Sequence, residues 1–257
     1  MTTLLLDFLL RIDQSAAAAL AFRSTVAIAL TFAIAVAARH ARASLRHLAF
    51  AALFVFLLLL PVASQFLPRG IVNAPQTHKA NIAATVAPAT RVLADITPSV
   101  DLGQALARTY VAGLALALLS LLAGIVRLRN LSHSGEVWLD GTARMNEIAY
   151  AAGIRRPVLV TLSDKVSVPM TYGFRRQIII LPDAARDWSA DALRRALRHE
   201  LEHVRRDDWA AQLIARIAVA IYWPQPLVWF AWRRFCLEAE RACDDAVVTM
   251  GTPSEDY

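Results

Sequence analysis

Three long apolar segments in the first half of the chain most strongly limit how it can fold. They cover about residues 16–38, 48–64 and 110–126. Each approaches the roughly 20 residues that a helix needs to cross the hydrocarbon core of a bilayer. If all three were buried helices of a soluble protein, little polar surface would remain, since 57% of the residues are hydrophobic and 19% are charged. We therefore predict three transmembrane helices within residues 1–128.

Arginines beside these segments predict their orientation. The link between the first two segments carries three arginines, and the stretch after the third carries two, namely Arg39, Arg42, Arg46, Arg127 and Arg129. Short positively charged loops stay on the cytoplasmic side of a membrane. Both loops follow this rule if an outer loop occupies residues 65–108 and a cytoplasmic domain occupies residues 129–257. A multi-pass protein of a bacterial-type inner membrane is the expected location.

The net positive charge of the chain also comes from arginines near the predicted transmembrane segments. The net charge is +6, and these arginines lie beside apolar runs. They are interpreted as topology signals at an anionic membrane face, so direct binding of nucleic acid is not expected. The two cysteines, Cys236 and Cys243, lie about two helical turns apart, too far for a disulfide, and are predicted to be buried, reduced thiols.

Residues 129–257 have the mixed pattern of an α+β domain. An amphipathic helix is predicted over residues 134–154, and strands over residues 156–163 and 175–182. Pro169 and Gly173 predict turns between the strands. Ile178, Ile179 and Ile180 are candidates for the edge strand that would hold a substrate backbone, or for its neighbour, because an extended peptide can add to an open sheet edge. A plain core strand is the alternative.

The segment LRHELEHVRRDD contains the pattern H-E-x-x-H at His199, Glu200 and His203. Ser189 is a plausible N-cap for this helix. Positions i and i+4 share one helix face, so the two imidazoles could bind one zinc ion. Glu200 could then take a proton from a water molecule at the metal and act as general base. The pattern alone also fits a solvated, charged helix face, and it needs further context.

A catalytic zinc ion requires a third protein ligand, and no histidine follows His203. The segment CLEAERACDDAVV supplies carboxylates instead. Glu240 is the strongest candidate ligand, and Asp244, one turn later, could accept a hydrogen bond from a ligand histidine. Glu238 and Asp245 are rival ligands, and an exposed acidic helix face is the alternative to all of them. Asp208 could brace the site or pair with an arginine.

Residues 209–232 are apolar enough to suggest a further span, but an arginine and two prolines interrupt them. A full crossing would place the two histidines and Glu240 on opposite sides of the membrane, where they could not share an ion. We therefore predict a helical hairpin. Whether it touches the bilayer through its tryptophans or is an ordinary buried hairpin stays open; these tryptophans are Trp223, Trp229 and Trp232.

From about Ser44 onward, the chain resembles the BlaR/MecR-like membrane zinc metallopeptidases of the antibiotic-sensor type. The resemblance rests on an ordered series of segments: LRHLAFAALFVFLLLLP, VPMTYGFRRQIIILP, LRHELEHVRRDD, WPQPLVWFAW and EAERACDDAVV. It implies N-terminal transmembrane helices followed by an α+β zincin-like (gluzincin) peptidase domain on the cytoplasmic side. It also implies Zn²⁺ as cofactor, His199, His203 and Glu240 as its ligands, and Glu200 as catalytic base.

One departure from the family pattern limits what the resemblance implies. Antibiotic sensors of this type carry an outer penicillin-binding domain after a fourth span, and neither that domain nor an S-x-x-K serine motif is found in this sequence. Either the chain is a fragment or this member lacks the sensor. A β-lactam ligand is therefore not inferred.

Three functions are compatible with the sequence. The leading hypothesis is a regulated, signal-transducing endopeptidase that cleaves a protein substrate, such as a transcriptional repressor, or cleaves itself. A second is a quality-control peptidase with many membrane-protein substrates. A third is a non-catalytic zinc-binding receptor or scaffold, against which the intact Glu200 argues, because a structural site needs no base. Whether the chain forms a homodimer is left open.

Overall fold

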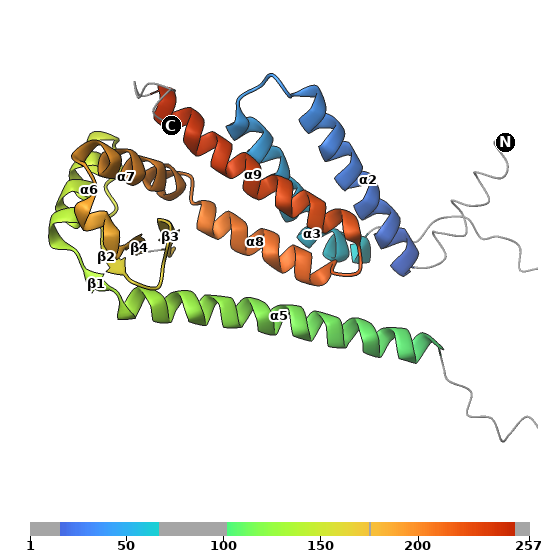
Figure 1. The fold of residues 1–257 in the computed structure, drawn as a ribbon. Helices are drawn as coiled ribbons and strands as arrows, with labels where there is room; N and C mark the ends of the chain where they lie inside the picture. Colours follow the sequence, from blue (N-terminus) through green and yellow to red (C-terminus); the bar gives the residue numbers. More distant parts are fainter. Residues whose placement is uncertain (1–15, 67–101, 175, 250–257) are drawn as a thin grey trace, which may run out of the picture.

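The computed structural model describes residues 16–66, 102–174 and 176–249. Three long helices, α2 (Ala16–Ala37), α3 (Ala43–Phe66) and α5 (Leu102–Ser134), precede a small mixed region of strands and helices. Each of the three contains a stretch long and apolar enough to cross a membrane. The three predicted segments thus coincide with helices, and α5 extends well beyond both ends of its segment (Figure 1). Most of the predicted outer loop lies outside the described residues.

A helical hairpin packs against these long helices. It consists of α8 (Asp208–Ile221) and α9 (Pro226–Thr249), which lie beside α3 in Figure 1. One apolar core joins the hairpin to α2 and α3, and its fully buried aromatic rings include Phe50, Phe54 and Phe235. The predicted hairpin is therefore present, and it belongs to the same packed unit as two of the candidate spans.

The turn of the hairpin is fixed at the middle of the long helices. Gln225 donates a hydrogen bond to Thr25 of α2 (2.8 Å), and the Tyr222 hydroxyl donates one to the Leu57 carbonyl of α3 (3.0 Å). The Trp223 ring lies against Gly113 of α5, where any Cβ would overlap it. The predicted boundary between a transmembrane region, residues 1–128, and a peptidase domain, residues 129–257, stays a prediction. These contacts join residues from both sides of that boundary.

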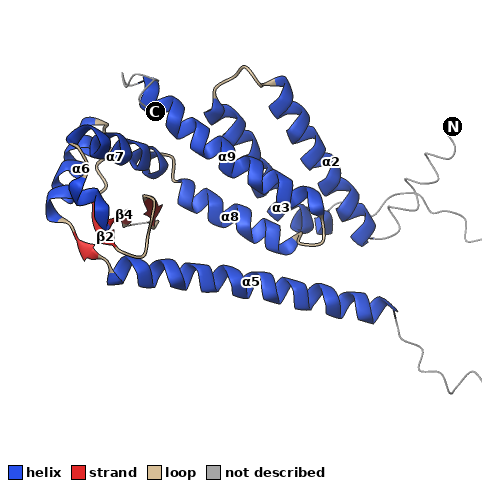
Figure 2. Cartoon of the chain, in the orientation of Figure 1, coloured by secondary structure: helices blue, strands red, loops and turns tan. Residues whose placement is uncertain are grey.

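A four-stranded sheet forms the opposite end of the molecule (Figure 2). Its strands are β1 (Glu136–Val137), β2 (Val158–Ser163), β3 (Met170–Tyr172) and β4 (Gln177–Pro182), in the order β1-β2-β4-β3. The central pair β2 and β4 is parallel, whereas β1 and β3 pair with them in antiparallel fashion. The inner strands are almost wholly buried, which explains their unbroken apolar runs.

One local expectation was wrong, and a second was incomplete. The helix predicted over residues 134–154 is divided, because its first residues form β1 and only α6 (Leu139–Ala151) is helical. Gly173 does lie in the connection between β3 and β4, with a φ angle of 114°, but the stretch before it also contains the edge strand β3. Ile178, Ile179 and Ile180 consequently lie on the interior strand β4, which is the neighbour of that edge and not the edge itself.

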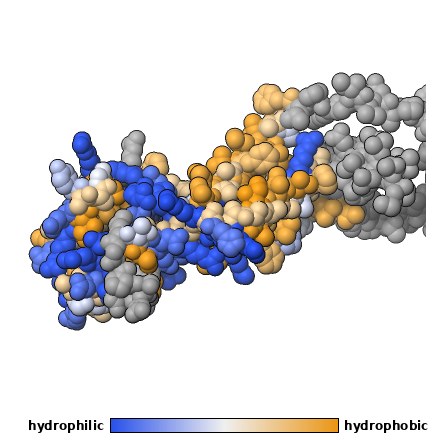
Figure 3. Space-filling view, turned by 90° about the horizontal axis from the view of Figure 1, so that it is seen from above, coloured by the Kyte–Doolittle hydropathy of each residue, from blue (hydrophilic) through white to orange (hydrophobic). Residues whose placement is uncertain are grey.

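A second apolar core lies between the sheet and the helices α6 and α7 (Ala190–Arg205), which adjoin it in Figure 1. Met145, Leu162, Ile179 and Leu197 are among its fully buried residues. On the face drawn in Figure 3, hydrophilic residues prevail at this end and hydrophobic residues at the other, and many apolar side chains of the long helices are exposed. The outer surface thus changes from hydrophilic to hydrophobic along the molecule, as expected for a protein that enters a bilayer at one end.

Candidate metal centre

Helix α7 carries both predicted histidine ligands on one face. The Ser189 side chain accepts a hydrogen bond from the Ala192 amide (3.2 Å), so the predicted N-cap is present. His199 and His203 lie one turn apart, and their ring centroids are separated by 5.1 Å. Their side chains are 19% and 12% exposed, which leaves the ring edges accessible from a cavity.

Helix α9 brings Glu240 opposite these rings. Glu240 Oε2 lies 3.4 Å from His199 Nε2 and 3.8 Å from His203 Nε2. Two ligands that are each 2.0–2.1 Å from a tetrahedral zinc ion lie about 3.3–3.4 Å apart. The two distances from Glu240 to the histidines are therefore close to the spacing between zinc ligands, and a small contraction would bring them to it.

The other nitrogen of each ring faces a second carboxylate. His203 Nδ1 lies 2.8 Å from Asp208 Oδ2, and His199 Nδ1 lies 3.3 Å from Asp244 Oδ1. Such carboxylates accept the Nδ1–H hydrogen bond of a metal-bound histidine and leave Nε2 free for the ion. The structure thus places both predicted bracing residues, Asp208 and Asp244, on the correct side of the rings for this role.

The electrostatics of this group favour a cation between the side chains. Burial lowers the pKa of His203, but its hydrogen bonds with Asp208, Cys243 and Glu240 outweigh this effect and raise the pKa to about 12. Hydrogen bonds from His199 and His203 hold the pKa of Glu240 well below its usual range. The site therefore retains a proton where a metal ion would otherwise bind, and binding of the ion would displace that proton.

Glu200 lies beside the ligands and is itself buried, with 5% of its surface exposed. Burial raises the pKa of Glu200, and a hydrogen bond from Thr171 acts against this rise. The Thr171 hydroxyl donates to Glu200 Oε2 at 2.6 Å. A raised carboxyl pKa suits a general base that works near neutral pH. Thr171 lies on the edge strand β3, and the sequence offered no signal that would have identified it.

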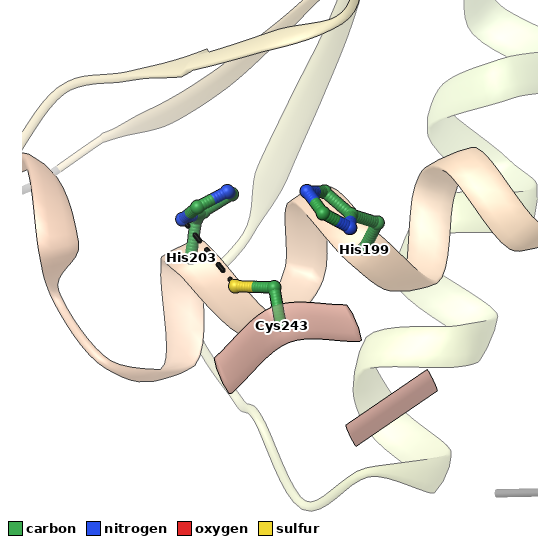
Figure 4. Close-up of side chains that lie close together, drawn as sticks. All are labelled: His199, His203 and Cys243. Atoms are coloured by element: carbon green, nitrogen blue, oxygen red, sulfur yellow. Dashed lines mark hydrogen bonds between the residues drawn. The ribbon is translucent and has the colours of Figure 1, made fainter. Parts of the chain in front are cut away.

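Cys243 is a second residue whose position the sequence prediction missed. Its Sγ lies 3.4 Å from His203 Nδ1, and together with the two histidines it forms a group that could hold a metal ion (Figure 4). However, it approaches the Nδ1 side of His203, which Asp208 already occupies. Burial also raises the pKa of Cys243, which favours the thiol over the metal-binding thiolate. On these grounds, Glu240 is the better candidate for the third ligand.

The rival carboxylate Glu238 takes no part in this group, because it is fully buried and paired with arginines. A cavity of about 900 Å³ opens above the ligands. Its walls come from α5, α8 and the edge strand, including Gly124, Gln212 and Met170, and the ligands themselves line it. The candidate base Glu200 lines the same cavity.

Comparison with known proteins agrees with this arrangement. A family model described as BlaR1 peptidase M56 matches residues 15–256. The chain belongs to this family. The BlaR/MecR-like resemblance read from the sequence is thereby confirmed, and membership of the M56 peptidases implies a metallopeptidase associated with a membrane.

A curated M56 relative, the regulatory protein BlaR1 of Bacillus licheniformis, is 35% identical over 91 residues. These residues make up 35% of this chain and 15% of that protein, so the chain matches only a small part of the relative's length. The roles of the relative's remaining parts are therefore not transferred to this M56 chain.

Proposed function

We propose that this chain is a membrane-anchored zinc endopeptidase with regulated activity. The observation that carries the proposal is the position of Glu240 Oε2, which faces Nε2 of both His199 and His203, with the buried carboxyl of Glu200 next to them. A structural metal site would not need a base at that place. Membership of a peptidase family supports the same reaction class.

Each side chain has a definite part in peptide hydrolysis. A bound zinc ion would polarise the substrate carbonyl and lower the pKa of a nearby water molecule. His199, His203 and Glu240 would hold the ion, and Asp208 and Asp244 would keep the imidazoles in the tautomer that frees Nε2. Glu200 accepts the proton of the attacking water and passes it to the leaving amine. The Thr171 hydroxyl holds the Glu200 carboxylate in place by its hydrogen bond.

The edge strand β3 provides the binding surface for the substrate backbone. Because β3 pairs only with β4 among the described strands, its other side is free to accept an extended peptide. Met170 and Thr171 of this strand line the cavity together with the metal ligands. A peptide added along β3 would carry its scissile bond past Glu200, and the isoleucines of β4 would form the neighbouring strand.

We further propose that the zinc site faces the cytoplasm of a bacterial cell and that the substrate is a transcriptional repressor, the chain itself, or both. The arginines that flank the long helices support this orientation. The cavity is bounded by α5, a candidate membrane span, so a change in the membrane region would reach the site directly. Regulation by a signal from outside is consistent with this arrangement.

The test compares protein N-termini in cells that express the wild type, Glu200→Gln or the matched control Glu202→Gln. Glu202 lies on the same helix but pairs with Arg205. New termini in one regulator, present with the wild type and the control and absent with Glu200→Gln, are the expected result. Termini spread over many membrane proteins would instead indicate quality control. Purified, zinc-loaded protein whose cleavage is unaffected by Glu200→Gln would contradict the proposed role of this base.

A further inference from the structure

The first turn of the membrane helix α3 is bonded to the helix that supplies the third metal ligand. Arg46 Nε donates a hydrogen bond to Glu238 Oε2 of α9 at 2.8 Å. The side chain of Arg46 is 10% exposed and that of Glu238 is fully buried. The same guanidinium donates to the carbonyls of Ala41 and Arg39, which lie in the link after α2. One arginine therefore fixes α9 to both α3 and the α2–α3 link.

Arg46 differs from the other arginines around Glu238. Arg234 and Arg241 also bind this carboxylate, at 2.7 and 3.2 Å, but both belong to α9 itself. They neutralise the charge without attaching α9 to another element. Within residues 16–66, 102–174 and 176–249, Arg46 is the partner that reaches Glu238 from elsewhere in the fold. Its contribution is therefore positional as well as electrostatic.

The geometry of a helix carries this effect to the metal site. Glu238 and Glu240 are two residues apart and point in directions that differ by about 200° around the axis of α9. Arg46 thus holds the side of α9 that faces away from the metal ligands. A rotation of α9 that moved Glu240 from the histidines would have to break the bond between Arg46 and Glu238.

The next residue of α3 reinforces the same junction. The His47 ring stacks on Phe235 of α9, with centroids 4.5 Å apart. His47 Nε2 also lies 3.8 Å from Asp208 Oδ1, the carboxylate whose other oxygen bonds to His203. The first turn of α3 therefore contacts both the helix of the glutamate ligand and the carboxylate that braces a histidine ligand.

We propose that Arg46 is a positioning residue of the metal centre, which sets the rotation of α9 through Glu238 and thereby holds Glu240 against His199 and His203. This inference rests on the proposed function, because it assumes that these three residues bind the metal. The membrane helix α3 is then part of the structure that determines metal affinity. A displacement of its cytoplasmic end would alter the ligand set without any contact to the ion.

The test uses the full 257-residue chain in detergent micelles and measures zinc affinity by competition with a chromophoric chelator. Co²⁺ absorption spectra report the ligand geometry independently of catalysis. Arg46→Gln should weaken zinc binding by about tenfold or more, the range for groups that orient metal ligands, and should change the Co²⁺ spectrum. Arg42→Gln, which removes an exposed arginine from the same link, should change neither.

Further variants cover the case in which Arg46→Gln does not fold. Arg46→Lys retains the charge but cannot bond Glu238 and the link carbonyls with one planar group, so its affinity should fall between those of the wild type and Arg46→Gln. Glu238→Gln should weaken zinc binding in the wild-type background but have no further effect on zinc affinity in the Arg46→Gln variant. If the two losses of affinity were additive, the proposal would be overturned. If Arg46→Gln does not fold, Arg46→Lys is decisive: a zinc affinity and Co²⁺ spectrum equal to those of the wild type would overturn the proposal.

The outcomes separate this inference from the proposed function. A wild-type chain that binds no zinc would refute both. A wild-type chain that binds one zinc ion, together with a folded Arg46→Gln variant of equal affinity and identical Co²⁺ spectrum, would refute the positioning role alone. Circular dichroism and thermal unfolding of each variant establish that it is folded. Arg234 and Arg241 still neutralise Glu238 when Arg46 is replaced, so no buried charge is left unpaired.

Discussion

Replacing Asp208 by asparagine should weaken zinc binding more than the same change at Asp244. Asp208 Oδ2 lies 2.8 Å from His203 Nδ1 and its side chain is 2% exposed. Asp244 Oδ1 lies 3.3 Å from His199 Nδ1 and its side chain is 43% exposed. An asparagine has no charge, so it orients the imidazole less firmly and no longer increases its basicity. Water can compensate for this loss at Asp244 but not at the buried Asp208.

The size of the effect follows from this difference in burial. Loss of a partner that orients a metal-bound histidine reduces metal affinity about 10–100-fold. Asp208→Asn should fall within that range, equivalent to about 1.4–2.8 kcal/mol of binding free energy. Asp244→Asn should lose less than about tenfold, because an exposed hydrogen bond is readily replaced by solvent.

The neighbouring Asp207 provides a matched control. It pairs with Arg156 at the surface, 2.7 Å away, and both side chains are more than 40% exposed. Its φ angle of 53° lies in the left-handed region, which asparagine tolerates as well as aspartate. Asp207→Asn should therefore leave zinc affinity unchanged and cost at most about 1 kcal/mol of stability.

The assay is competition with a chromophoric chelator, applied to the full chain and to each of the three variants. Equal losses at Asp208 and Asp244 would show that burial does not govern the effect. A larger loss at Asp244 would reverse the assignment of the bracing carboxylates. A loss at Asp207 would indicate a general destabilisation and not a local change at the metal site.

Three other predictions address the ligands, the base and the membrane core. His203→Ala should abolish stoichiometric zinc binding. Zinc binding to the wild type near neutral pH should release about one proton, because the metal replaces the proton on His203, whose pKa is about 12. Calorimetry in two buffers of different ionisation enthalpy measures this release, and its absence would contradict a protonated metal-free site. Thr171→Val should leave zinc affinity unchanged and move the acidic limb of the pH–rate profile to higher pH. The hydrogen bond from Thr171 lowers the pKa of Glu200, so its loss raises that pKa. An unmoved limb would exclude Glu200 as the titrating base. Residues 129–257 produced alone should aggregate, because α8 and α9 would lose the apolar surface of α2 and α3; a soluble, zinc-binding fragment would show that the two parts fold separately.

Much of the fold was predictable because it depends on local patterns. The long helices follow from apolar length, and α7 follows from its N-cap and its periodicity. The arrangement of His199, Glu200 and His203 needs only the repeat of one helix. Glu240 was found because it shares a helix with Asp244, one turn away, and the same repeat places Cys243 beside them. The sequence predicts Cys243 as a buried thiol, but its proximity to His203 depends on how α9 packs against α7.

The remainder depends on contacts between distant segments, which a single sequence does not reveal. Thr171 binds Glu200 only because three residues of an apparent turn pair with β4. A strand this short, beside Pro169 and Gly173, carries too little pattern to outweigh the turn signals. Arg46 appeared to be an ordinary positive-inside arginine, and nothing local distinguishes it from Arg42. Its buried partner is far away in the sequence and became visible only with the fold.

The packing of α9 against α3 also has a consequence for the order in which the protein assembles. The bond from Arg46 to Glu238 joins residues 192 positions apart. The chain emerges from the ribosome with its N-terminus first, so α2 and α3 are made long before α9. Contacts between such distant segments also close late in folding. Glu240 therefore reaches the two histidines only after α9 has docked on α2 and α3, which are already made. A chain in which α9 has not yet docked would lack that carboxylate beside its histidines, so the proposed peptidase site would be completed last.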